Sequence, residues 1–72
     1  MKLDCRGMLC PQPVIALARA ARELPTGSEI LITTDDPAAE VDIPAWCRMR
    51  KHQCVRSASV DGAVSHIVTV TR

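Results

Sequence analysis

Two prolines fix the point at which a first helix can begin in this chain. Pro11 and Pro13 stand directly before an apolar pattern that predicts a helix over residues 14–24. Proline suits the first helical turn, because its φ angle is already helical and its missing N–H would have no intrahelical partner there. The expected apolar face of this helix consists of Val14, Leu17, Ala21 and Leu24, widened by Ile15 and Ala18.

Two segments around this helix read as strands. Residues 2–5 form a short candidate strand before the Arg6-Gly7 turn, and Pro25-Thr26-Gly27 ends the helix. Residues 28–34 are dense in β-branched side chains and lack polar alternation at their centre. This pattern predicts a central strand that is buried on both faces.

A second helix follows, and its start is set by another proline. We place its N-cap at Asp42 and Pro44 in its first turn, and we extend it to about His52. Asp35 and Asp36, in the sequence Asp35-Asp36-Pro37, are interpreted as turn and capping residues rather than acid–base groups. The expected apolar stripe of this helix is Ile43, Trp46, Cys47 and either Met49 or Arg50.

The C-terminal third of the chain has the pattern of a β-hairpin. Residues 54–60 and 64–71 flank Asp61-Gly62, a dipeptide typical of a two-residue type I′ turn. Their register predicts one helix-packed face made of Val55, Val64, Val68 and Val70. The element order is βαβαββ, and the predicted fold is α+β: a two-layer α/β sandwich with a four-stranded mixed sheet and both helices on one face.

Composition limits the class of protein. The 72 residues suffice for one small domain over residues 1–72, and Trp46 is the sole aromatic residue, so the core must be aliphatic and thin. The formal net charge is +1 and no basic tract is present, which argues against direct nucleic-acid binding. No apolar leader follows Met1 and no segment is long enough to span a bilayer, so we expect a cytoplasmic protein without membrane contact.

Cys10 has the strongest case for chemistry among the four cysteines. It stands at the head of the first helix, in the expected cap position, where unpaired N–H groups and the helix dipole favour a thiolate. Neither His52 nor His66 is positioned by local sequence as a general base, and both are interpreted as structural or surface residues. A thiol activated in this way suits reversible sulfur exchange better than hydrolysis.

The other three cysteines can be explained as structural residues. Cys5 is either a second, resolving thiol near Cys10 or a buried residue at the end of a strand. Cys47 and Cys54 are interpreted as core or edge residues. The spacings of the four cysteines are wider than those of structural zinc sites, so we expect no metal.

The motif residues resemble a known family. The segment from Leu3 to Pro13 reads Leu-Asp-Cys-Arg-Gly-Met-Leu-Cys-Pro-Gln-Pro, and is similar to the Cys-Pro-x-Pro signature of the TusA/SirA family of small sulfur-carrier proteins. Asp35-Asp36-Pro37, the run from Asp42 to Cys47, and His52 extend the resemblance over essentially the whole chain. Trp46 stands where the family often has Phe, and Cys5 lies at a position that the signature leaves open.

The resemblance implies a sulfurtransferase that acts as a stoichiometric carrier and needs no cofactor. Cys10 would accept sulfane sulfur as a persulfide from a donor protein, such as a cysteine desulfurase or a rhodanese, and pass it to an acceptor protein. The destination would be tRNA thiolation, molybdenum-cofactor assembly or sulfur metabolism. Pro11 and Pro13 would shape the helix start, and Asp4 and Gly7 the loop before it. Two alternatives stay open: a non-catalytic interaction or regulatory module, and a redox switch between Cys5 and Cys10.

Overall fold

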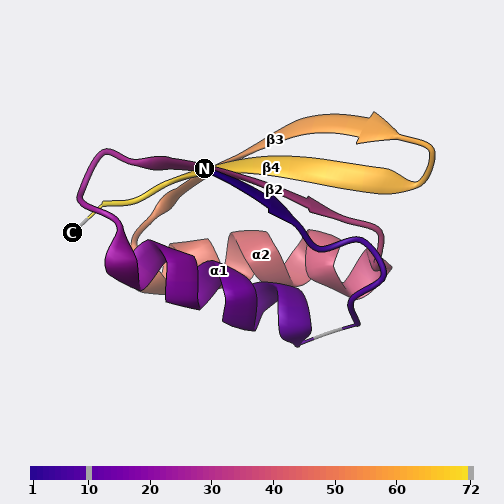
Figure 1. The fold of residues 1–72 in the computed structure, drawn as a ribbon, viewed down its shortest axis with the longest axis horizontal. Coiled ribbons are helices and arrows are strands. Elements are labelled where there is room, and N and C mark those ends of the chain that lie inside the picture. Colours follow the sequence, from indigo (N-terminus) through magenta and orange to yellow (C-terminus); the bar gives the residue numbers. More distant parts are fainter. Residues whose placement is uncertain (10, 72) are drawn as a thin grey trace.

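The chain folds into the expected βαβαββ order. In the computed structural model, which describes residues 1–9 and 11–71, one sheet lies above two helices (Figure 1). The elements are β1 (Lys2–Asp4), α1 (Gln12–Glu23), β2 (Glu29–Thr34), α2 (Pro37–Arg50), β3 (Gln53–Val60) and β4 (Ala63–Thr69). The α+β sandwich predicted from the sequence is therefore confirmed.

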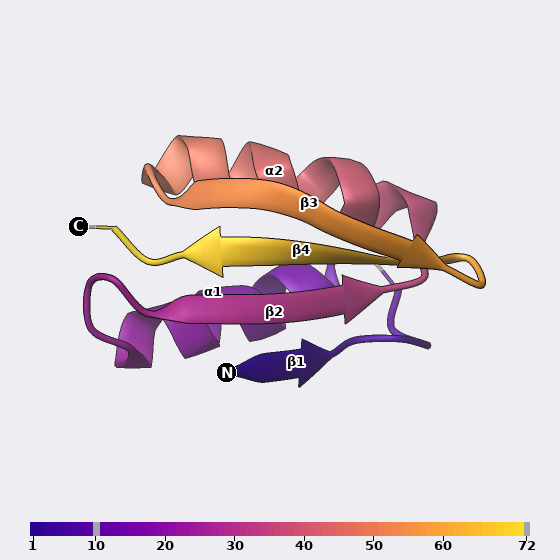
Figure 2. The ribbon, with the colours of Figure 1, turned by 90° about the horizontal axis from the view of Figure 1, so that it is seen from above.

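The sheet is mixed and its strand order is β1-β2-β4-β3. β1 runs parallel to β2, whereas β4 is antiparallel to both β2 and β3. Seen from above, the four strands lie side by side and both helices lie beneath them (Figure 2). The register of β3 against β4 shifts between Arg56 and Ala58, which marks a bulge in this edge strand.

The core fills the space between the helices and one face of the sheet. Its members are aliphatic or small, as a chain with one aromatic residue requires. The buried cluster consists of Cys5, Leu17, Ala20, Ala21, Ile30, Ile32, Ala39, Ile43, Cys47, Val68 and Val70.

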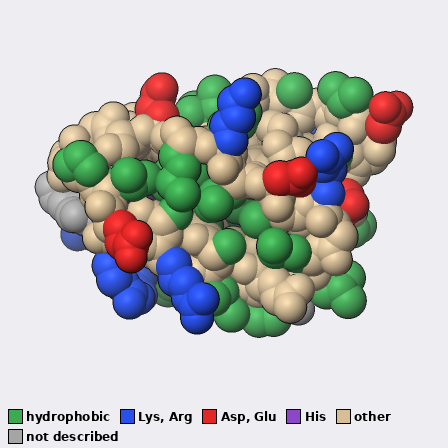
Figure 3. All heavy atoms as spheres, in the orientation of Figure 1, with side chains coloured by type: hydrophobic (Ala, Val, Ile, Leu, Met, Phe, Trp, Pro, Cys, Tyr) green, Lys and Arg blue, Asp and Glu red, His purple; other side chains and the backbone are tan. Residues whose placement is uncertain are grey.

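One side of this core is only partly covered. β1, the edge strand on this side, is only three residues long, so it covers little of the core between the sheet and α1. Figure 3 shows hydrophobic side chains gathered across the middle of this face of the molecule. Leu3, Val14 and Leu24 pack against the core while staying partly exposed.

The expected inward face of the hairpin is wrong at one position. Val64, Val68 and Val70 are buried, but Val55 is 62% exposed. Cross-strand partners share a face, and Val68 is paired with Cys54 while Val55 is paired with Ile67. Val55 therefore lies on the face of the sheet that no helix covers.

The expectation that β2 is buried on both faces is also wrong. Ile30, Ile32 and Thr34 are buried against the helices, whereas Leu31 and Thr33 on the other face are only half-buried. β2 is an interior strand of the sheet, but the helices cover only one side. Apolar and β-branched residues on the open side made the segment look doubly buried.

The start of α2 differs from the sequence-based expectation. The N-cap is Asp36 rather than Asp42, and the Asp36 carboxylate accepts a hydrogen bond of 3.1 Å from the Ala38 N–H. Pro37 then occupies the first turn, as proline does best. Pro44 lies inside the helix, where it removes one intrahelical hydrogen bond at a typical cost of about 3 kcal/mol. The extra turns that bury Ala39 help to offset that cost.

Smaller differences concern the edges of the helical stripes. Ile15 and Met49, both expected to be on apolar faces, are exposed, as is Arg50. Pro13 and Ala20 are buried instead. Since α1 begins at Gln12, its buried stripe starts at Pro13, one residue before the predicted start of the helix. No helix within residues 1–9 and 11–71 is long and apolar enough to cross a bilayer.

The two valines on opposite faces of the hairpin provide a test of this register. Val68→Ala should lower the free energy of unfolding by about 2 kcal/mol, because Val68 is fully buried. Val55→Ala should change it by less than about 0.5 kcal/mol. Urea denaturation followed by Trp46 fluorescence measures both; equal losses for the two variants would contradict the register.

Candidate functional site

The loop between β1 and α1 is fastened to the neighbouring strand at two points. The Cys5 N–H donates to the Thr33 carbonyl over 2.8 Å, which continues the β1–β2 pairing by one residue. The Gly7 N–H donates to Asp35 Oδ1 over 2.9 Å. The loop that leads to the Cys-Pro-Gln-Pro motif is therefore held against the junction of β2 and α2.

Gly7 supplies the turn within this loop. Its φ angle is +83°, a conformation that side chains with a Cβ rarely adopt. The Met8 N–H then donates back to the Cys5 carbonyl over 3.2 Å. A Cβ at Gly7 would meet no atom within 4 Å, so the requirement for glycine comes from the backbone angle alone.

The start of α1 is built from the residues on both sides of Cys10. The N-cap position, expected at Cys10, falls on Pro11. The Gln12 N–H donates to the Leu9 carbonyl over 2.8 Å, and the Leu9 N–H donates to the Gln12 side-chain oxygen over 3.3 Å. Pro13 is buried beneath the first turn. Cys10 itself lies outside the described residues.

The electrostatics of the described surroundings suit an anion at the start of α1. No acidic residue lies in the first turn of the helix, residues 12–15.

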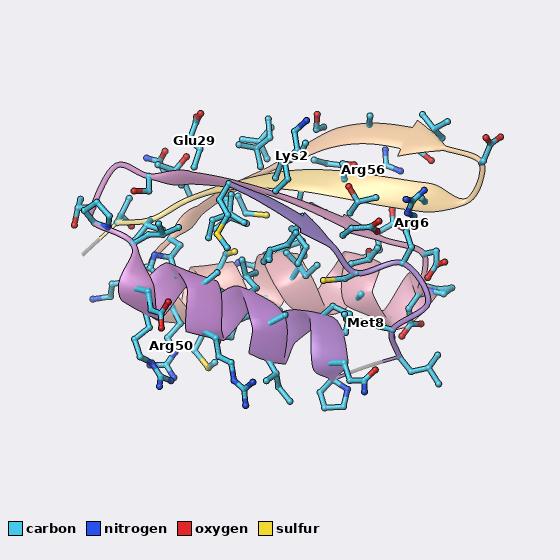
Figure 4. All side chains as sticks on the ribbon, viewed as in Figure 1. Lys2, Arg6, Met8, Glu29, Arg50 and Arg56 are labelled. Atoms are coloured by element: carbon cyan, nitrogen blue, oxygen red, sulfur yellow. The ribbon has the colours of Figure 1, made fainter. Side chains whose placement is uncertain are left out.

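Arg6 forms an ion pair with Asp4, with 2.8 Å between Nη2 and Oδ2. The Arg6 hydrogen bonds lower the pKa of the Asp4 carboxyl to about 2. Asp4 thus holds its charge and binds Arg6, which lies at the level of the sheet, at the loop end of the molecule (Figure 4).

Cys5 is 1% exposed and belongs to the core cluster. Burial, and secondarily the charge of Asp4, raise the pKa of the Cys5 thiol. A buried, protonated thiol of this kind is a poor nucleophile. These observations favour the interpretation of Cys5 as a core residue at the end of β1.

The two histidines belong to other parts of the chain, His66 to β4 and His52 to the turn after α2. His66 is buried in the sheet, and burial lowers the pKa of its imidazole. His52 contacts Trp46, with 5.2 Å between ring centroids, and its Nδ1 accepts a hydrogen bond from the Thr71 N–H over 3.1 Å. Both histidines are thus built into the packing of other elements.

The structure adds a residue whose role the sequence reasoning missed. Asp35 was expected only to act in a turn or cap, yet its carboxylate binds the backbone of the Gly7 loop from 28 residues further along the chain. No local pattern signals such a bond, because the partner is a backbone N–H brought close by the β1–β2 pairing. Among residues 1–9 and 11–71, no three His, Cys, Asp or Glu side chains are grouped to hold a metal ion.

A shallow groove lies beside the start of α1. It has a volume of about 260 Å³ and is lined by Met8, Gln12, Ile15, Ala16 and Arg19. Leu9, next to the groove in sequence, is 72% exposed. The helix start therefore presents apolar side chains to solvent, with a cation at the rim.

Comparison with known proteins agrees with this geometry. The family described as "Sulfurtransferase TusA" matches residues 1–70. The chain belongs to the TusA family. Membership implies a sulfur-carrier role. A crystal structure of a SirA-like protein from Desulfitobacterium hafniense has the same fold, with a TM-score of 0.88 at 19% sequence identity, over 99% of this chain and 97% of the other.

The ion pair in the loop predicts an unusual titration. A carboxyl whose pKa is lowered in the folded state contributes stability above the unfolded pKa and loses it as the pH falls through the folded pKa. For Asp4 this window lies between its ordinary value of 3.8 and about 2. Carboxyl chemical shifts followed by NMR should place the Asp4 midpoint near 2. Arg6→Gln should return it toward the ordinary value; an unchanged midpoint in this variant would contradict the assigned cause.

Proposed function

We propose that the chain relays sulfane sulfur as a persulfide on Cys10. The donor is a protein that carries a persulfide, such as a cysteine desulfurase or a rhodanese. The acceptor is another sulfur-relay protein rather than a nucleic acid, in a reducing, cytoplasmic setting. The sulfur would serve tRNA thiolation, molybdenum-cofactor assembly or sulfur metabolism.

The observation that carries this proposal is the family match over residues 1–70, which includes the Cys-Pro-Gln-Pro motif. The described residues around the motif support it. Pro11 caps α1 and Pro13 is buried in its first turn, while Gly7 and its bond to Asp35 anchor the loop. Asp4 and Gly7 are therefore proposed to shape the site, and Pro11 and Pro13 to fix the helix start.

The proposed chemistry is a thiol–persulfide exchange. The Cys10 thiolate attacks the terminal sulfur of the donor persulfide, a new S–S bond forms on Cys10, and the donor's S–S bond breaks to release the donor thiolate. Transfer to the acceptor repeats the step with Cys10 as the leaving thiolate. The atoms and electrons balance without a cofactor, and the protein acts as a stoichiometric carrier.

The start of a helix favours both forms of such a carrier. Backbone N–H groups and the positive end of the dipole stabilise a thiolate and an anionic persulfide alike. The absence of acidic residues from the first turn of α1 leaves this effect unopposed there. The burial of Cys5 supports a relay that uses Cys10 alone rather than a disulfide between the two.

Intact-mass spectrometry tests the carrier role. After incubation with a cysteine desulfurase and cysteine, the wild-type chain should gain one sulfur atom that dithiothreitol removes. Cys10→Ser should gain none, whereas Cys54→Ser should load as the wild type does. An added sulfur that persists in Cys10→Ser would overturn the assignment.

The partner is proposed to contact the apolar side chains beside the helix start. Leu9 and the groove next to Met8 and Ile15 offer a contact surface around the motif. Figure 4 shows Met8 near the start of α1 and Arg50 at the opposite end of the helical layer. Met49, adjacent to Arg50, is 70% exposed and provides a matched control.

Leu9→Glu should slow sulfur loading from the protein donor by at least about tenfold, which corresponds to about 1.4 kcal/mol. Met49→Glu should leave that rate unchanged. Loading by a small polysulfide should be similar for both variants, because no protein contact is needed. Equal slowing by both variants with the protein donor would contradict this docking surface.

A further inference from the structure

Two cysteines that the proposed relay does not use lie together where α2 ends and β3 begins. Cys47 is in the last turn of α2 and is 1% exposed. Cys54 is the second residue of β3 and is half-buried. Both pack within or against the same hydrophobic core.

The turn between the two elements explains how they meet. Lys51 adopts a left-handed conformation with a φ angle of +63° and ends the helix. The His52 N–H donates to the Cys47 carbonyl over 2.8 Å, so the chain reverses directly over Cys47. Cys54 is paired with the fully buried Val68, which turns its side chain toward the helices.

The two side chains are neighbours. The Cys47 thiol lies within hydrogen-bonding reach of Cys54 Sγ, with Cys47 on the donor side, and neither cysteine is in a disulfide. Two neighbouring thiols, one at the end of a helix and one at the start of the strand that follows it, need little chain movement to be joined. This contact is independent of the start of α1 and of the proposed function.

We propose that Cys47 and Cys54 are a reversible oxidation site, at which a low-molecular-weight disulfide such as oxidised glutathione converts the two thiols into an intramolecular disulfide. The bond would join the C-terminal turn of α2 to β3. It would form without involving Cys10.

The two sulfurs have different parts in this step. Burial raises the pKa of both thiols, that of Cys47 to about 12, but the hydrogen bond from Cys47 partly offsets the effect at Cys54. Cys54, the more accessible sulfur, attacks the small disulfide and releases one thiolate. Cys47 loses its proton and attacks Cys54 Sγ, which releases the second thiolate. Two protein thiols are oxidised and one small disulfide is reduced to two thiols.

The raised pKa values of the two thiols lower the rate of this exchange, but they do not make the disulfide unfavourable at equilibrium. The rate depends on the thiolate fraction, whereas the equilibrium depends on how well the fold holds the two sulfurs together. Brief exposure to an oxidant would therefore leave the pair reduced, and sustained exposure would close it. Closing the short loop should also raise the melting temperature, because the unfolded chain loses freedom.

The equilibrium can be measured in a glutathione buffer on a Cys10→Ser background. Trypsin separates the two cysteines, since Cys47 falls in residues 23–48 and Cys54 in residues 52–56. After acid quenching and alkylation, mass spectrometry gives the ratio of linked to alkylated peptides. This ratio should be at least about tenfold higher for the folded chain than for the chain in guanidinium chloride at the same redox ratio.

Two variants on the same background serve as controls. Cys54→Ser should abolish the linked peptide, and Cys5→Ser, which removes a buried thiol elsewhere in the core, should leave the ratio unchanged. A ratio in the folded chain equal to or below that in guanidinium chloride would overturn the proposal. Linkage of Cys47 to Cys5 in place of Cys54 would overturn it equally.

Discussion

Burial of aliphatic side chains between one sheet face and two helices holds this small chain together. The sheet has a single covered face, so Ile30, Ile32 and Val68 must pack against Leu17 and Ile43 without aromatic bulk. Each of these side chains is a large share of the total driving force in a domain of this size. The positions of the helices, and with them the start of α1, follow from this one interface.

The site depends on that interface through a single loop. The parallel pairing of β1 with β2 brings the Gly7 turn next to Asp35, and the hydrogen bond between them anchors the loop before α1. Pro11 and Pro13 then set the helix direction without relying on a side-chain cap. Together these contacts hold the residues on both sides of Cys10 in fixed positions relative to the sheet.

The sequence predicted the order of elements, the mixed sheet and the family, because turn signals and the Cys-Pro-Gln-Pro motif are local. It placed the start of α2 wrongly because two capping signals, at Asp36 and Asp42, compete, and only packing of Ala39 chooses between them. Val55 was misplaced because valine suits either face of a strand, and the partner strand fixes the register. The hydrogen bond from Gly7 to Asp35 depends on long-range strand pairing, which no local sequence pattern predicts. The proximity of Cys47 to Cys54 depends on the turn that joins α2 to β3, which was not predicted either.

The bulge in β3 affects how the molecule behaves among its own copies. β3 is the longest strand and forms an open edge of the sheet. Its outer backbone N–H and C=O groups are available to hydrogen-bond with a strand of a second chain. The shift between Arg56 and Ala58 breaks the regular spacing of those groups. Arg56 also forms an ion pair with Glu40 of α2, with 3.3 Å between Nε and Oε1. Irregular spacing of this kind disfavours edge-to-edge pairing with a second copy of the chain.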